Sequence, residues 1–210
     1  MVTGEGKLLK ISSKMVNFTE HLLNFGAIGI ITTMTIQLVP YYDVHKSIYL
    51  NLQFSTLFSH SASILLSKDI DYLSLFTNFD SRSFNSVWVG SKSKKVEFYG
   101  LLETTQKVHP VPGMDSAPCV GGGRGPWNEK IYHFVPEMQP SSAGEELQSE
   151  YFVRFEQMEQ TLEKLYEIRE KFKDLIQICE VRVIKQDDIP RSPANGRLTA
   201  AFHFTWHKKP

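Results

Sequence analysis

Hydrophobic and polar residues follow the same order of patterns in two stretches of the chain. Each stretch begins with a segment that alternates between apolar and polar residues, continues with apolar residues at helical spacing, and ends with two more alternating segments. Side chains alternate across a strand and recur every three to four residues on a helix, so each stretch predicts the order β-α-β-β. The segments are residues 45–54, 55–66, 71–79 and 86–92 in the first stretch, and 146–155, 156–173, 178–184 and 198–206 in the second.

The helix predicted at 156–173 has the clearest pattern. Its apolar stripe consists of Met158, Leu162, Leu165, Ile168 and Phe172. A stripe of this kind packs one face of a helix on a core. Together the two units predict an α+β fold with a mostly antiparallel sheet and helices on one face.

The beginning of the chain gives shorter patterns. Residues 7–11 and 30–38 predict strands, and Asn17 is placed to cap a short helix over 18–25. Between the two β-α-β-β units, residues 100–145 hold most of the prolines and glycines and are interpreted as a loop. The GGGRGPW run in that loop is interpreted as a turn, because it lacks the pattern of a phosphate-binding loop.

Composition argues against several classes of function. The chain has 23 basic and 23 acidic residues, so its net charge favours neither nucleic acid nor an anionic membrane as a partner. Its two cysteines have no metal-ligand or disulfide-scaffold spacing, and no metal site is expected. The longest apolar run, residues 25–31, is too short to cross a bilayer, and no signal-peptide pattern precedes it, so a cytoplasmic location is predicted.

Polar residues gather on one face of three strands predicted in the second half of the chain. On the strand 178–184, Glu180 and Arg182 point away from the face that carries Cys179 and Val181. By the same alternation the predicted polar face also carries Gln148, Glu150, His203 and Thr205.

Two interpretations of this polar face are open. Antiparallel sheets often leave one side in water, and charge pairs there contribute only about 0.2 to 1 kcal/mol. Alternatively, the apolar residues Phe152, Ile178 and Ile184 on the same face indicate that something covers it. A covered face must satisfy its carboxylate, guanidinium, imidazole and hydroxyl groups, and a hydroxyl-rich ligand can do so.

Several segments resemble one enzyme family. The runs ELQSEYFV, CEVR and FHFTW, with GPWNEKIYHF and FGAIGIITTMTIQLVP upstream, resemble the alditol (xylitol) oxidases of the vanillyl-alcohol oxidase flavoprotein superfamily, whose nearest relatives are the aldonolactone oxidases. The resemblance implies that residues 1–42 are the C-terminal segment of an FAD-binding domain. It also implies that residues 43–210 are a substrate (cap) domain, incomplete at its C-terminus.

The resemblance also implies a function and a site. The expected reaction is FAD-dependent oxidation of the terminal CH–OH of an alditol such as xylitol to an aldose, with oxygen as acceptor and hydrogen peroxide as product. Arg182 is expected to stabilise the developing alkoxide, and Glu180 to orient the alcohol or accept its proton. The other expected site residues are Gln148, Thr205 and His203 for the substrate and Gly26, Ala27, Gly29 and Ile30 for FAD.

Three further expectations concern the whole protein. The family's chains are longer, so this chain is expected to be a fragment that needs the missing half of the FAD domain for activity and binds FAD weakly or not at all alone. An aldonolactone oxidase is the alternative within the enzyme class. A polyol-binding fragment without catalysis is the alternative outside it.

Overall fold

The computed structural model describes residues 1–210 except 94–95, 118, 132–144 and 209–210. The chain divides into two compact units, one of residues 1–41 with 184–199 and the other of residues 42–183 with 200–210. The segment 184–199 therefore groups with the beginning of the chain, which the sequence pattern did not predict. The assignment of FAD-binding and cap domains to these parts stays a prediction.

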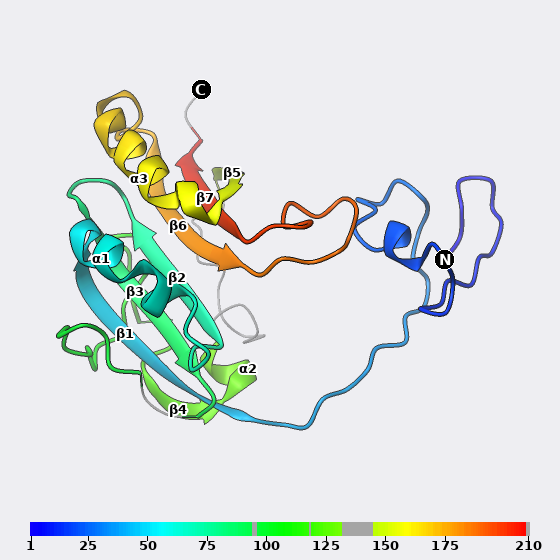
Figure 1. Ribbon diagram of the computed structural model, residues 1–210, viewed down its shortest axis with the longest axis horizontal. Helices are drawn as coiled ribbons and strands as arrows, with labels where there is room; N and C mark the ends of the chain where they lie inside the picture. Colours follow the sequence, from blue (N-terminus) through cyan, green and yellow to red (C-terminus); the bar gives the residue numbers. More distant parts are fainter. Residues whose placement is uncertain (94–95, 118, 132–144, 209–210) are drawn as a thin grey trace. The chain divides into compact units, whose positions relative to one another are not determined.

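The larger unit is built on one seven-stranded sheet, and both predicted β-α-β-β units are confirmed (Figure 1). The first comprises β1 (Asp43–Gln53), α1 (Phe54–Leu65), β2 (Tyr72–Thr77) and β3 (Ser83–Ser91). The second comprises β5 (Glu146–Arg154), α3 (Met158–Glu167), β6 (Ile176–Ile184) and β7 (Thr199–His207). The strand order is β4-β1-β3-β2-β6-β7-β5. The two units meet where β2 pairs antiparallel with β6.

Shorter elements complete the described chain. They are the 3-10 turns η1 (Phe18–His21), η3 (Phe155–Gln157) and η4 (Arg169–Lys171), the strand β4 (Gly123–Pro126) and the helix α2 (Trp127–Lys130). The predicted loop over 100–145 thus contains an edge strand and a short helix. Residues 132–144, which include the end of the GPWNEKIYHF motif, lie outside the described residues. In the described part of the chain, no helix is long and apolar enough to cross a membrane.

Helices α1 and α3 both cover one face of the sheet, as the sequence predicts (Figure 1). The fully buried Leu57 and Ile64 from α1 join Met158 and Leu162 from α3 in a single core with strand residues from both units. The predicted long helix is shorter in the structure, because the α-helix ends at Glu167 and a 3-10 turn follows it. Its stripe residues Leu165 and Phe172 still pack against this core.

The opposite face of the sheet is covered by a segment made of residues 104–117 and 119–122, with Val108 and Val111 packed on it. Cys119 of this covering segment is buried against Ile48, Trp88, Phe76 and Ile178 in a second, smaller core. The sheet is therefore buried on both sides over β1, β2 and β3. The polar face predicted for the second unit lies on the same side of the sheet as the second core.

A buried lysine holds this covering segment. Lys46 on β1 is fully buried, its Nζ donates a hydrogen bond of 2.9 Å to the carbonyl oxygen of Val120, and it lies 3.9 Å from the centroid of the Trp88 ring. Desolvation by burial lowers the pKa of Lys46 to about 7. No sequence pattern marks this residue, since Lys46 occupies an ordinary position in an alternating strand.

The predicted strands of the smaller unit are wrong. Within the described residues, 7–11 and 30–38 contain only isolated bridges, of Leu8 and of Ile30 with Val2. A strand needs a neighbour to hydrogen-bond with, so β-branched composition alone does not make one. The short helix after Asn17 exists only as a 3-10 turn, and the Asn17 side chain does not cap it.

Candidate functional site

The centre of the predicted polar face is an ion-pair cluster around Arg182. Its Nη2 donates a hydrogen bond of 2.8 Å to Oε1 of Glu150, and its Nε lies 3.8 Å from Oε1 of Glu180. Because β7 lies between β6 and β5, the Arg182–Glu150 pair spans the width of β7. Arg182 therefore joins the three strands of this part of the sheet.

The strand register fixes the face on which this cluster lies. Glu180 pairs with Phe76 of β2, and Phe76 belongs to the core on the side away from the helices. Its neighbours Cys179 and Val181 belong to the helix-side core. Glu180 and Arg182 therefore lie on the face opposite α1 and α3.

One atom of the cluster has an unmet hydrogen-bonding need. The Nε of Arg182 is buried and has no hydrogen-bond partner among the described residues, since the 3.8 Å separation from Glu180 is too long for a hydrogen bond. A buried donor without an acceptor costs free energy, and the cost is larger for a charged group. A ligand oxygen placed there would remove the cost.

The remaining predicted substrate residues lie on the neighbouring strands. His203 and Thr205 alternate on β7 with Phe202 and Phe204, which belong to the helix-side core. Thr205 is buried, and His203 is partly exposed. Alternation places both side chains on the same face as Arg182.

Gln148 on β5 makes a local contact. Its Nε2 donates a hydrogen bond of 2.6 Å to Glu146, two residues earlier on the same strand. Gln148 thus shares its strand and its alternating face with Glu150, the partner of Arg182.

Glu150 is the residue to which sequence reasoning gave no role. Alternation placed it on the polar face, but the contact with Arg182 crosses β7, which comes later in the chain than either residue. The available sequence signal was that Gln148 and Glu150 are two residues apart on one strand, so that their side chains point to the same face. The cluster thus brings two carboxyl groups and one guanidinium together on one face of the sheet.

The four predicted FAD residues lie in the smaller unit. Gly26 has φ of +75°, with open space where a Cβ would stand, and Gly29 has φ of +141°. A Cβ on Gly29 would lie 2.3 Å from the backbone oxygen of Val2, so contact within this unit requires that glycine. The backbone N–H groups of Gly26, Ala27 and Ile30 are already bonded to Asn24 or Val2.

These contacts limit what the glycine segment can offer a cofactor. With three backbone donors in use, the segment is poorly suited to bind phosphate groups. Ile30, with 74% of its surface exposed, and Phe25, with 81%, provide apolar surface beside the open space at Gly26. The segment fits contact with a flat ring system.

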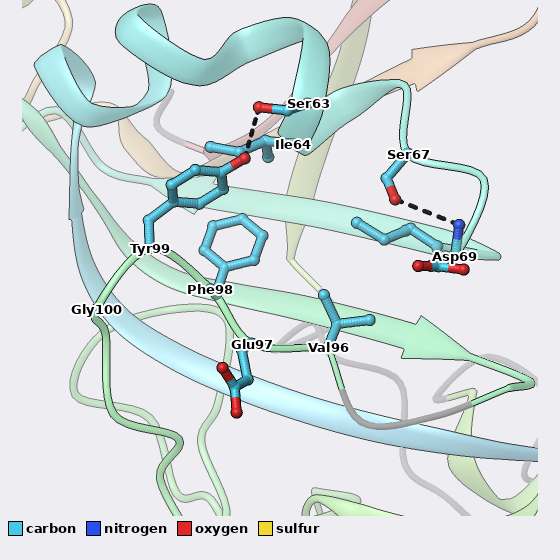
Figure 2. Close-up of a pocket in the computed structure, with 10 residues that line it drawn as sticks. Ser63, Ile64, Ser67, Asp69, Val96, Glu97, Phe98, Tyr99 and Gly100 are labelled. Atoms are coloured by element: carbon cyan, nitrogen blue, oxygen red, sulfur yellow. Dashed lines mark hydrogen bonds between the residues drawn. The ribbon is translucent and has the colours of Figure 1, made fainter.

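A cavity of about 630 Å³ lies elsewhere, on the helix side of the sheet (Figure 2). It is lined by the end of α1 and the segment 96–100. Tyr99 Oη and Ser63 Oγ are 2.5 Å apart, and Ser67 Oγ accepts a hydrogen bond from the Asp69 N–H, so these lining groups satisfy one another. None of the predicted site residues lines this cavity.

Comparison with known proteins shows a similarity to a curated enzyme. The chain is similar to an alditol oxidase from Streptomyces sp. (strain IKD472 / FERM P-14339), with 32% identity over 217 residues. The match covers 99% of this chain and 50% of the relative, so the chain spans about half the length of the curated relative it matches. No family model matches the sequence. The resemblance to alditol oxidases read from the sequence motifs is therefore confirmed.

Proposed function

We propose that this chain, which resembles the alditol oxidases over its whole length, forms part of an FAD-linked oxidoreductase of the polyol oxidase type. The proposed reaction is oxidation of the terminal CH–OH of an alditol such as xylitol to an aldose, with oxygen as the final acceptor and hydrogen peroxide as product. The polyol binds to the Arg182 face of β5, β6 and β7.

One observation carries the proposal. The Arg182 guanidinium lies between two carboxylates, and its buried Nε has no hydrogen-bond partner among the described residues, on the same sheet face as an amide, an imidazole and a hydroxyl. Water can reach the exposed part of the Arg182 side chain, but not its buried Nε. A polyol offers several oxygens that both accept and donate, which is the complement this set requires.

The cofactor fit rests on the smaller unit. Gly26, Ala27, Gly29 and Ile30 would contact an apolar edge of FAD, since their free surface is apolar and most of their backbone donors are used. When bound, FAD supplies the two-electron acceptor for the hydride of the alcohol carbon.

The residues of this chain would manage the alcohol proton and the position of the polyol. Arg182 donates to the reacting oxygen and stabilises the negative charge that develops as the O–H proton leaves. Glu180 accepts or relays that proton, and Glu150 holds the guanidinium from the far side of β7. Gln148, His203 and Thr205 bind hydroxyl groups further along the polyol chain.

The proposed function is tested by mixing the protein with FAD, removing unbound cofactor, and adding xylitol without air. Loss of the oxidised flavin absorbance, followed by peroxide release on aeration, supports it. A 1,4-aldonolactone serves as the comparison substrate. Bleaching by the lactone and not by xylitol would favour an aldonolactone oxidase, and bound xylitol without bleaching of bound flavin would favour a polyol-binding protein.

Thr205→Val tests the hydroxyl-binding role of the last strand. Valine keeps the shape of threonine and removes one hydroxyl, so the variant is expected to raise the KM for xylitol about ten-fold with little change in kcat. Steady-state peroxide release measures both constants. The matched control is Thr161→Val, whose hydroxyl bonds the Gln157 carbonyl on the surface of α3 and should leave both constants unchanged. Equal constants in the Thr205 variant and the wild type would remove this residue from the site.

A further inference from the structure

A second cavity, of about 300 Å³, lies on the face of the sheet away from the helices, between the middle of β1 and β3 and the segment 107–116. Its volume is at the lower end of the range for small-molecule sites. None of the residues assigned to the polyol site lines it.

Ser86 gives the cavity a buried group that needs a partner. Its side chain lines the cavity, only 1% of its surface is exposed, and its Oγ has no hydrogen-bond partner among the described residues. Leaving a buried hydroxyl unbonded is costly, so its persistence at a cavity wall points to a ligand.

The strands are irregular at this point. Leu50 pairs with Ser86 and Leu52 with Phe84, while Asn51 between them has φ of +60°. The irregularity leaves Asn51 and Asn85 to line the cavity. Backbone conformations that cost free energy persist where the surrounding structure or a function requires them.

The amide of Asn85 is oriented by its neighbour. Its Oδ1 accepts a hydrogen bond of 2.9 Å from the Asn78 N–H. The side-chain atom left for another partner is therefore the donor Nδ2.

The covering segment adds further donors. His109 lines the cavity, and its Nδ1 lies 3.0 Å from the Val111 nitrogen and 3.2 Å from the Val111 carbonyl oxygen. Lys107 donates from Nζ to the Ala117 carbonyl, which uses one of its three protons. The nearby carboxylate of Asp115 accepts from the Ala117 N–H and does not line the cavity.

We infer that this cavity binds a small oxyanion, namely the carboxylate of a hydroxylated acid, with Ser86 and Asn85 donating to its oxygens and Lys107 supplying the charge. The lining residues bring one cation and no carboxylate, so an acceptor-rich anion is favoured over a cation or an apolar molecule. This site does not depend on the proposed oxidase activity.

Isothermal titration of the full chain with D-gluconate tests the inference, with xylitol as the uncharged comparison. Saturable binding of gluconate is expected, and Lys107→Met is expected to weaken it about ten-fold. Ser86→Ala is expected to weaken it several-fold while leaving the unfolding free energy of the ligand-free protein unchanged or higher, because it removes an unsatisfied buried hydroxyl. A hydroxyl with only a structural role would not change gluconate affinity.

Arg182→Met separates this cavity from the polyol face. It is expected to leave gluconate affinity unchanged, whereas equal losses in the Arg182 and Lys107 variants would place gluconate elsewhere and overturn the inference. Absence of gluconate binding, or binding of xylitol with the same sensitivity to Lys107→Met, would also overturn it. Failure of the oxidase proposal would leave the gluconate result untouched, so the two outcomes are distinguishable.

Discussion

Arg182→Met is expected to lower kcat/KM for xylitol oxidation by about a thousand-fold in FAD-loaded protein that includes the missing half of the FAD domain. Methionine keeps much of the aliphatic length of arginine and removes the guanidinium that spans β7 to Glu150 and faces Glu180. Without it, the alkoxide that develops as the alcohol proton leaves has no cation beside it. Steady-state peroxide release over a range of xylitol concentrations measures the change.

The chain offers a matched control for this substitution. Arg82 is bonded to Glu163 on the surface of α3, so it forms an arginine–glutamate pair away from the candidate site. Arg82→Met should retain wild-type turnover. A similar loss in both variants would indicate damage to folding, and full activity in Arg182→Met would remove the residue from the mechanism.

Lys46→Met is expected to remove a pH dependence of stability that the wild type shows between pH 7 and pH 9. In the unfolded chain the lysine holds its proton up to about its ordinary pKa of 10.5, whereas burial lowers the pKa in the folded chain to about 7. Between these values the unfolded state binds more protons, so the free energy of unfolding rises with pH. The expected rise for wild type relative to the variant is roughly 2 kcal/mol across these two pH units.

The neighbours of Lys46 determine the pH range in which its effect on the free energy of unfolding can be measured separately. Cys119 favours the charged lysine and Lys130 opposes it, both with smaller effects than desolvation. Burial raises the pKa of the Cys119 thiol, so its own contribution to stability has the opposite sign and begins near its ordinary value of 9. Measurements below that pH isolate the lysine.

Urea unfolding of the two proteins at several pH values checks this prediction. Lys92→Met is the control, because Lys92 also lies over an aromatic ring, Tyr42, but about half of its side chain is exposed. The control should follow the wild-type pH dependence. A wild-type curve parallel to that of Lys46→Met would mean that Lys46 titrates near its ordinary pKa in the folded state.

Alternation and helical spacing were enough to predict the sheet of the larger unit. Each strand of the two β-α-β-β units buries one set of side chains, so apolar residues recur at every second position. The apolar stripe beginning at Met158 and Leu162 marked the face of α3 that packs on the core. The same reasoning failed at residues 30–38. There the side chains Ile36 and Leu38 are exposed on an extended segment, because strand formation depends on a partner and not on composition.

Only one part of the candidate site could be predicted from the sequence, namely which side chains of a single strand share a face. Alternation along the strand placed Glu180 and Arg182 on one face, and the resemblance suggested their roles. The bond from Arg182 to Glu150 depends on strand order, since β7 enters the sheet between β6 and β5. The burial of Lys46 and of the Ser86 hydroxyl depends on the covering segment folding back over the sheet, which no local pattern encodes.

The most direct test of the central claim, that the Arg182 face receives a polyol, is the NMR signal of the Arg182 Nε–H during a xylitol titration of the 210-residue chain. This donor is buried and has no hydrogen-bond partner among the described residues, so a bound hydroxyl oxygen should shift its resonance in a saturable way. The Nε–H signal of Arg82 serves as the internal reference and should stay unchanged. An Arg182 signal that stays fixed up to high xylitol concentration, or moves only in step with Arg82, would contradict the account.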